Sequence, residues 1–487
     1  MATRNTIPGW GTRLGTWIPR WVIAFAAGLV SVGAAEELRF PPPDFESGYV
    51  MPATQYPAAR LQGLEWLDVV VLLVSLGVAS YLAYSKRSRA GLVAVSGFSL
   101  VYFGFYREGC VCAIGSVQNV ALAVFGTGYA LPVGVAVFFA APLLVALFLG
   151  RTFCSAVCPH GALQDLVLIR PVRVPRWLES GLGVLPFLYL GAGIAFAATG
   201  AAFLICRFDP FVPIFRRTGS LGMLLTGGAF LVLSLFVGRP YCRFLCPYGA
   251  LLKVASALSR WRVRITPDVC TQCGLCPGSC PFGIIREPDP GWVRPRDVAR
   301  ARRRILAALA ALPVLALAGT GAGWLFGGVA ARLHPTVALV EEYGRTVASG
   351  SALPGTEETT AARRLALARA ERQFRELSPQ AESVLKRFRV AGLWFGFGCG
   401  VVVAVRWISL GMARRRHEFE PDRTACFACA RCFQSCPQER LRLGWIPGIE
   451  AVNVSRLPVS AERLPESVPA AKSGGCGCAS AAGGTDA

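Results

Sequence analysis

The chain has 487 residues, of which 53% are hydrophobic and 16% charged, and its mean hydropathy is +0.47. This balance indicates an α-helical integral membrane protein. The formal net charge of +21 would suit a nucleic-acid-binding protein, but much of the excess lies in short loops beside apolar segments, where membrane topology explains it. We therefore expect the membrane, and no nucleic acid, as a partner.

Residues 1–64 open the chain with a short apolar run that follows several arginines and ends in small residues. This pattern fits a signal peptide and a signal anchor equally well. Either interpretation places the acidic, proline-rich stretch that follows outside the cytoplasm.

Seven apolar segments then predict membrane helices, at residues 66–84, 90–106, 131–150, 181–205, 221–237, 305–330 and 390–410. With the N-terminal run they make seven or eight transmembrane helices. Basic residues gather at alternate ends of the segments, and these ends are assigned to the cytoplasm by the positive-inside rule. Residues 65–264 are thus the predicted transmembrane core.

Two segments of this core end in a repeated pattern, Arg-x-aromatic-Cys-x3-Cys-Pro-x-Gly-Ala-Leu. Its cysteines are Cys154 and Cys158 in the first copy and Cys242 and Cys246 in the second. If each helix continues to the proline, the Cβ atoms of a pair lie about 5–6 Å apart, whereas a disulfide needs about 3.8 Å. We expect the four thiolates to share one metal centre, a candidate further iron–sulfur cluster. Redox dithiols and another metal are the alternatives.

Four other cysteines fall on the outer side in the predicted topology. Cys112 begins a weaker echo of the repeat that lacks the proline, and Cys110, Cys206 and Cys399 lie on the same side. These four are a candidate external redox site, which would suit electron flow across the membrane. A disulfide among them, or plain buried thiols, is the alternative.

Residues 265–304 and 412–446 each carry the pattern C-x2-C-x2-C-x3-C-P, typical of a bacterial [4Fe–4S] ferredoxin half. The eight cysteines are Cys270, Cys273, Cys276, Cys280, Cys426, Cys429, Cys432 and Cys436. A structural zinc site is the alternative, but it usually shows two separated C-x2-C pairs. The prolines and nearby basic loops also favour reduced, metal-bound thiolates over disulfides.

The pattern also predicts how the two halves share their cysteines. Three closely spaced thiolates hold one cluster, and the following proline turns the chain so that the fourth cysteine reaches the other cluster. One cluster would then be held by Cys270, Cys273, Cys276 and Cys436. The other would be held by Cys426, Cys429, Cys432 and Cys280.

Residues 305–411 separate the two halves in the sequence. An even number of spans returns the chain to the same face, so we expect a cytoplasmic 2[4Fe–4S] ferredoxin-like domain split by a transmembrane hairpin with an external helical loop. Cys280 and Cys436 should then lie close together. Residues 447–487 predict a disordered cytoplasmic tail that ends in Cys476 and Cys478.

The membrane repeats and ferredoxin patterns together resemble the NosR/NapH-type membrane polyferredoxins, over roughly residues 90–438. The resemblance implies iron–sulfur electron transfer at the bacterial cytoplasmic membrane, often from quinol to periplasmic acceptors. The eight ferredoxin cysteines match the family's cluster ligands, and the four cysteines of the repeats match its membrane motif. The flavin-attachment motif of one branch of the family is not found, so no FMN domain is expected.

These observations predict an electron-transfer component rather than a stand-alone catalyst. It would carry two [4Fe–4S] clusters and a candidate third, and pass electrons between quinol or a cytosolic donor and a periplasmic redox protein. None of the histidines, His160, His334 and His417, lies in the middle of a span, so no haem is expected. The alternative is an assembly factor that reduces or delivers a metal such as copper for a respiratory enzyme.

Overall fold

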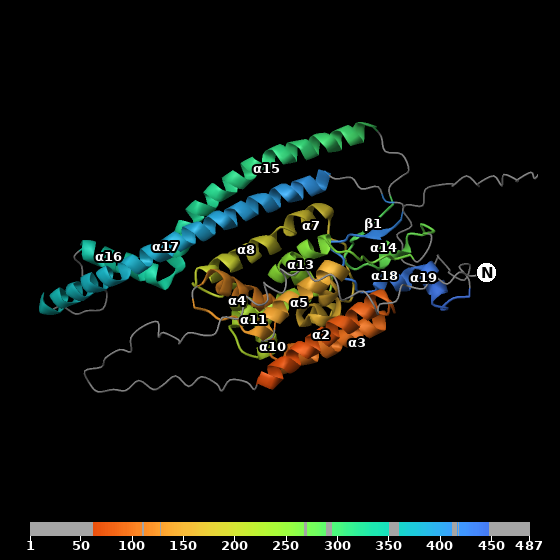
Figure 1. Cartoon of the computed structure of the whole chain (residues 1–487), viewed down its shortest axis with the longest axis horizontal. Helices are drawn as coiled ribbons and strands as arrows, with labels where there is room; N and C mark the ends of the chain where they lie inside the picture. The colour runs from red at the N-terminus through yellow and green to blue at the C-terminus, as the bar shows by residue number, and fades with distance from the viewer. Residues whose placement is uncertain are drawn as a thin grey trace, which may run out of the picture.

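The described part of the chain is almost entirely helical, and its longer helices run along one long axis (Figure 1). A computed structural model describes residues 62–109, 112–126, 128–266, 270–288, 295–349, 360–411, 416 and 418–447. The predicted N-terminal signal run, the predicted disordered tail, Cys110, His417, Cys476 and Cys478 lie outside the described residues.

The elements are, in chain order, α2 (Gln62–Tyr84), α3 (Arg89–Ser99), the π-helix η1 (Leu100–Tyr106), α4 (Ala113–Phe125), α5 (Val133–Leu149), the π-helix η2 (Phe153–Val157), α6 (Pro159–Leu166), α7 (Arg176–Leu182), α8 (Leu185–Ala198), α9 (Leu204–Arg207), α10 (Val212–Arg216), α11 (Leu221–Ser234), α12 (Pro240–Phe244), α13 (Pro247–Ala257), α14 (Leu275–Ser279), β1 (Ile285–Arg286), α15 (Pro295–Ala330), the 3-10 helix η3 (Ala331–Leu333), α16 (Pro335–Ser349), α17 (Thr360–Gly411), β2 (Glu420–Pro421), α18 (Arg431–Ser435) and α19 (Pro437–Arg442).

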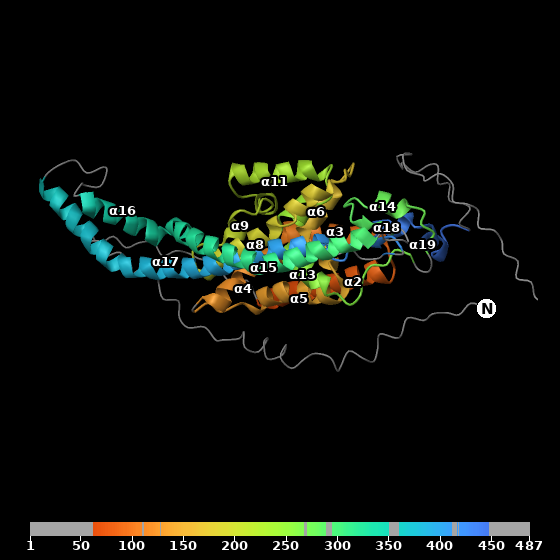
Figure 2. The ribbon, with the colours of Figure 1, turned by 90° about the horizontal axis from the view of Figure 1, so that it is seen from above.

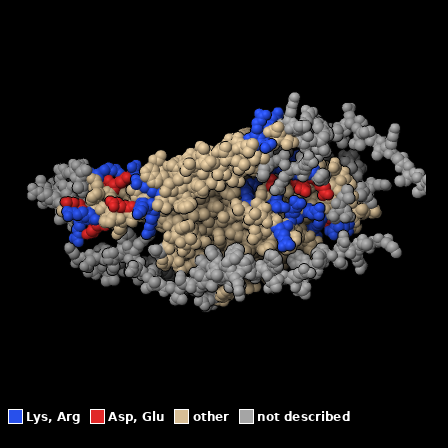
Figure 3. All heavy atoms as spheres, turned by 45° about the horizontal axis from the view of Figure 1, so that its top comes forward, with Lys and Arg blue, Asp and Glu red and all other residues tan. Residues whose placement is uncertain are grey.

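Five of the described helical segments are long and apolar enough to cross a membrane: Gly63–Tyr84, Arg89–Tyr106, Trp177–Ala198, Val298–Leu333 and Phe374–Ser409. On the face shown in Figure 3, charged side chains gather at the two ends of the molecule and are scarce on the surface between them. A membrane protein requires this distribution, because a charged side chain in the hydrocarbon core is costly. The chain is therefore a membrane protein.

The five segments overlap five of the predicted spans, those at 66–84, 90–106, 181–205, 305–330 and 390–410. The other two, at 131–150 and 221–237, correspond to the shorter apolar helices Val133–Leu149 and Leu221–Ser234, and Ala113–Phe125 is a further short apolar helix. The total of seven or eight membrane helices stays a prediction.

The long helices α15 and α17 lie against each other, as both views of the ribbon show (Figures 1 and 2). Glycines recur at every fourth position where they touch: Gly319, Gly323 and Gly327 on α15, and Gly392, Gly396 and Gly400 on α17. A side chain at Gly396 would collide with the carbonyl oxygen of Gly319, and one at Gly323 with that of Gly392. Small residues let two membrane helices approach backbone to backbone, and this pair is packed in that way.

The two segments with ferredoxin-type cysteines pack together, although α15 to α17 separates them in sequence. Strand β1 pairs antiparallel with β2, with Arg286 opposite Glu420. Beyond the strands, the N–H of Asp422 donates to the carbonyl oxygen of Ile284 at 3.0 Å. A small buried cluster draws on both segments and contains Ile265, Cys276, Ile285 and Cys436, with Cys280, Phe419 and Cys432 packed against it. Cys280 and Cys436 thus belong to one cluster of side chains.

Four cysteines that precede prolines share one backbone conformation. Their ψ angles are 119° at Cys158, 115° at Cys246, 109° at Cys280 and 117° at Cys436. The clash between a proline ring and the preceding residue disfavours the helical region there. Three of the prolines then begin new helices, α6, α13 and α19, for which their fixed φ is suited. The chain therefore turns at each of these cysteines.

Candidate functional site

A hollow between the two ferredoxin-type segments is lined by cysteines from both. Cys270, Cys273 and Cys276 come from the first segment and Cys436 from the second, and apolar atoms of Ile265 and Phe419 complete the wall. The Cys276 thiol interacts electrostatically with the other three. We call Cys270, Cys273, Cys276 and Cys436 the first thiol group.

The reverse combination forms a second group. The Cys432 thiol interacts with those of Cys426, Cys429 and Cys280, and more weakly with that of Cys276. We call Cys426, Cys429, Cys432 and Cys280 the second thiol group. Each group takes three cysteines from one segment and one from the other, the combination expected from the sequence. That the groups bind clusters stays a prediction.

The chemistry of these donors fits an iron–sulfur cluster. Burial, with the neighbouring thiols, raises the pKa of Cys276 to about 12 and the pKa of Cys432 well above its ordinary value. Crowded thiols of this kind ionise when a cation offsets their charge, as iron does in a cluster. Among the described residues, no three His, Cys, Asp or Glu side chains are already placed to hold a single metal ion.

The cysteines of the two membrane repeats form a third set, all of them buried. Cys154 lies in η2, Cys158 caps α6, Cys242 lies in α12 and Cys246 caps α13. The Cys158 thiol interacts with those of Cys242, Cys154 and Cys246. We call these four the membrane thiol group. A π-helical turn, rather than the expected α-helical one, separates Cys154 from Cys158, and π-helical turns often mark functional sites.

The first arginine of each repeat, Arg151 or Arg239, lies against residues of the other repeat. Arg239 donates from Nη1 to the carbonyl oxygen of Cys154 and from Nη2 to that of Ser155, the latter at 3.0 Å. A side chain at Gly161 would meet Arg239 Nη1, and one at Gly249 would meet Arg151 Nη2. The glycines of the two copies thus leave room for guanidinium groups that offset negative charge on the sulfurs.

Gln164 is a site residue that sequence reasoning left without a role. Its side chain is fully buried, its Nε2 donates to Cys242 Sγ at 3.3 Å, and its Oε1 accepts from the N–H of Tyr241 at 3.1 Å. Gly249 N–H donates to Cys246 Sγ at 3.3 Å. Hydrogen bonds to cluster sulfurs set reduction potentials, so these donors would tune a cluster bound here.

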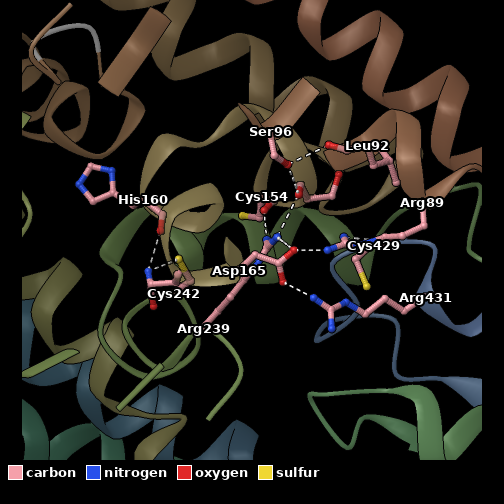
Figure 4. Close-up of polar contacts among 12 residues, drawn as sticks. Arg89, Leu92, Ser96, Cys154, His160, Asp165, Arg239, Cys242, Cys429 and Arg431 are labelled. Carbon is pink, nitrogen blue, oxygen red and sulfur yellow. Dashed lines mark hydrogen bonds and ion pairs between the residues drawn. The ribbon is translucent and has the colours of Figure 1, made fainter. Parts of the chain in front are cut away.

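Three arginines from distant parts of the chain converge on Asp165 (Figure 4). Arg89 lies 2.5 Å from one carboxylate oxygen and Arg431 3.1 Å from the other, and Arg239 approaches to 3.5 Å. Arg431 belongs to α18, between two cysteines of the second thiol group. Burial alone would raise the pKa of Asp165, which lies outside the candidate spans, but the three guanidinium groups hold that pKa at about 2. Asp165 therefore ties the membrane repeats to the second thiol group.

Phe427 is a second link between these parts. It lies in the second ferredoxin-type segment and is 1% exposed. Its ring centre lies 4.3 Å from the Arg151 guanidinium and 5.5 Å from that of Arg239. The Phe282 ring packs on it at 4.8 Å. Cation–π and ring contacts thus join the membrane thiol group to the second thiol group across one side chain.

Of the outer cysteines that the structure describes, Cys112 and Cys206 are near each other. Cys112 interacts with Cys206, and the Cys158 thiol lies within electrostatic reach of Cys112. Cys399 lies on α17, and no described interaction joins its thiol to that of Cys112 or Cys206. The sequence placed Cys112 and Cys158 on opposite faces of the membrane, so this proximity is a finding of the structure.

Comparison with known proteins connects this geometry to a family. A family model described as "4Fe-4S binding domain" matches residues 131–176 and 220–266. The matched residues contain the whole membrane thiol group. No solved structure matches the chain.

Several curated proteins are similar to parts of the chain. YccM of Escherichia coli, whose provisional name is electron transport protein, is 33% identical over 29% of this chain and 44% of its own length. Protein NirI of Paracoccus denitrificans is 33% identical over 33% of this chain and 25% of its length. The regulatory protein NosR of Pseudomonas aeruginosa is 29% identical over 42% of this chain and 30% of its length. The chain spans less than half of each. These similarities confirm the resemblance to the NosR/NapH-type membrane polyferredoxins.

Proposed function

We propose that this chain is a membrane-bound electron-transfer protein that conducts electrons through three iron–sulfur centres. The observation that carries the proposal is the position of Phe427, whose buried ring contacts both arginines of the membrane repeats and lies beside the second thiol group. Arg239 interacts electrostatically with Cys242 and Cys154 of the membrane thiol group and with Cys429 of the second thiol group. Redox centres held this close would exchange electrons directly.

The first and second thiol groups would each hold a [4Fe–4S] cluster, and the membrane thiol group would hold a third. Such clusters supply reversible one-electron chemistry when bound. The chain's own residues would set the potentials: Gln164 and the Gly249 N–H donate to sulfurs, and Arg151 and Arg239 offset their charge. The match of a 4Fe-4S binding family to both membrane repeats supports the third centre.

The proposed path begins or ends at quinol or a cytosolic donor and leads to a periplasmic redox protein. The first and second thiol groups would face the cytoplasm, because basic residues gather on the loops that lead to them. The hairpin of α15 and α17 would then be an insertion into a split ferredoxin-like domain. Its two crossings would return the chain to the same face, and the pairing of β1 with β2 supports that arrangement.

Metal analysis and spectroscopy of the full chain test this function. We expect anaerobically purified protein to hold about twelve irons and as many sulfides, four for each of three clusters. Cys276→Ser, Cys432→Ser and Cys242→Ser should each remove a different EPR signal of the reduced protein. Cys399→Ser is the matched control and should remove none. Zinc in place of iron, or equal losses in all four variants, would overturn the proposal.

Electron flow is tested separately in membrane vesicles. Vesicles with the wild-type chain should pass electrons from a quinol to an impermeant acceptor on the opposite face, and Cys242→Ser should abolish that transfer. Transfer that persists in Cys242→Ser at the wild-type rate would show that the membrane thiol group is not on the path.

A further inference from the structure

Two glutamines of the bundle make the same pair of contacts with two different cysteines. Gln164 binds Cys242 Sγ and the N–H of the preceding residue, as described above. Gln118 donates from Nε2 to Cys206 Sγ at 3.4 Å and accepts at Oε1 from the N–H of Ile205, which precedes Cys206. The weak sequence echo at Cys112 is therefore a structural repeat of the membrane module.

The repeat extends to the cysteine that precedes each glutamine. Cys158 precedes Gln164 at the same spacing at which Cys112 precedes Gln118. Each copy also has a glycine at the same place, Gly161 in one and Gly115 in the other. The pair Cys112 and Cys206 thus corresponds to the pair Cys158 and Cys242 of the membrane thiol group.

Both sulfurs of this outer pair lie against Gly115. Cys112 Sγ accepts from the backbone N–H groups of Ile114, at 3.3 Å, and Gly115. Cys206 Sγ would lie 3.1 Å from a Cβ atom placed on Gly115. The two sulfurs thus lie near the same glycine, and a Cβ atom at that position would be in tight contact with Cys206 Sγ.

The two cysteines differ in access. Cys112 is half-buried, and its thiol interacts electrostatically with that of Cys158. Cys206 is exposed, between the exposed side chains of Phe203 and Phe208. Cys112 is the residue before α4, and Cys206 lies in α9. The two helices lie on the side of the bundle away from α14 and α18 (Figure 2). The less accessible cysteine is therefore the one that interacts with the membrane thiol group, and the other is open to a partner.

We propose that Cys112 and Cys206 are a redox-active thiol pair that reduces a disulfide in a partner protein. An exposed thiol backed by a less accessible one is the arrangement that thiol–disulfide exchange needs. The inference rests on the proposed function for its supply of electrons.

The exchange balances in two attacks. The Cys206 thiolate attacks one sulfur of the partner's disulfide, a mixed disulfide forms, and the other partner sulfur leaves as a thiolate. The Cys112 thiolate then attacks Cys206 Sγ, which releases the second partner thiolate and leaves a Cys112–Cys206 disulfide. Two electrons, delivered one at a time from the centre at the membrane thiol group, and two protons restore the dithiol.

Differential alkylation with mass spectrometry, in a series of glutathione redox buffers, tests the pair in the full chain. We expect Cys112 and Cys206 to lose reactivity together, in one two-electron transition, and to appear as a linked peptide pair. Cys399 should stay a thiol over that range. In Cys112→Ser, glutathione disulfide should leave a stable adduct on Cys206. Independent alkylation of the two cysteines across the whole series would overturn the proposal.

Iron content and single-electron reduction separate this inference from the proposed function. If Cys206→Ser loses iron, Cys206 is a cluster ligand and the thiol pair is wrong. If the pair titrates with glutathione but photoreduced methyl viologen does not open its disulfide, the thiol pair stands and the electron supply fails. If all EPR signals are present but no disulfide forms, the thiol pair falls and the proposed function stands. We expect viologen to open the disulfide in the wild type and not in Cys242→Ser.

Discussion

The guanidinium of Arg151 lies 4.3 Å from the ring centre of Phe427, and this contact crosses from the membrane repeats to a segment far away in the sequence. Arg151 also donates from Nη2 to Cys154 Sγ at 3.8 Å, and Phe427 directly follows Cys426. One arginine and one ring therefore fill the space between the membrane thiol group and the second thiol group.

Replacing that ring tests whether it matters for electron flow. Phe427→Leu keeps an apolar side chain but removes the ring contacts with Arg151, Arg239 and Phe282, which costs about 1 kcal/mol of stability. We expect all clusters to be retained and electron transfer between the two groups to slow several-fold, in stopped-flow reduction of the purified chain.

Phe433→Leu is the matched control, because Phe433 is as buried as Phe427 and also packs under an arginine, Arg87 at 4.8 Å. It should cost similar stability and leave the rate unchanged. Equal slowing in both variants would mean that the effect is loss of packing and not loss of the bridge.

Asp165 should be a strong determinant of stability. Asp165→Asn leaves Arg239, which is fully buried, and Arg431 without their carboxylate partner. Breaking a buried ion pair from one side typically costs about 3–5 kcal/mol, and we expect a loss of about 3 kcal/mol in chemical unfolding. Glu371→Gln, which breaks the exposed pair with Arg375, should change little.

The same carboxylate gives a pH dependence. Its pKa is lowered from 3.8 to about 2 by the three arginines, which outweigh burial. A group whose pKa is depressed by folding adds stability above its unfolded pKa and loses that stability as the pH falls toward the folded value. The stability difference between wild type and Asp165→Asn should therefore be constant above pH about 5 and shrink between pH about 4 and about 2. A difference that does not shrink would contradict the ion-pair explanation.

Local sequence patterns were enough to predict which of the ferredoxin-type cysteines come together. The spacing of Cys270, Cys273 and Cys276, with proline after the fourth cysteine, predicted which thiols would meet, because the constraint is local and the pre-proline turn is steric. The structure brings Cys436 to those three. The long apolar segments were equally visible, because hydrophobic length is a direct requirement of the bilayer.

Contacts between distant residues were not visible in the same way. Nothing in the local sequence of Asp165 indicates that Arg89 and Arg431 will converge on it, because their meeting depends on how whole helices pack. The proximity of Cys112 to Cys158 was missed for a related reason. The predicted topology assigned each cysteine to one face of the membrane by counting spans. Such a count does not show that the backbone turn at Cys158 is buried inside the helix bundle.

The close glycine contacts between α15 and α17, which we call the glycine seam, should keep the two ferredoxin-type segments in place relative to each other. Gly396→Leu would force a side chain into the backbone of Gly319, which the close approach of the helices does not allow. We expect loss of stability of at least about 3 kcal/mol and loss of iron from both ferredoxin-type groups. Gly398→Leu is the matched control: it lies on the same helix, and a Cβ atom there meets nothing within 4 Å. Normal iron content in Gly396→Leu would show that the seam does not position the cysteines.

Gln164 should set the reduction potential of a cluster in the membrane thiol group. Its Nε2 donates to Cys242 Sγ at 3.3 Å from a fully buried position. A hydrogen bond to a ligand sulfur stabilises the additional negative charge of the reduced cluster, so its removal disfavours reduction. We expect Gln164→Leu to retain iron and to lower the potential of one EPR signal, the one that Cys242→Ser removes, in a redox titration.

The structural repeat supplies the control for that titration. Gln118→Leu removes the same kind of bond, but to Cys206, which lies outside the membrane thiol group. It should leave all cluster potentials in place and instead change the alkylation of Cys206. A cluster potential that moves equally in Gln118→Leu and Gln164→Leu would assign the shift to general loosening of the bundle, since of these two glutamines only Gln164 donates to a sulfur of the membrane thiol group.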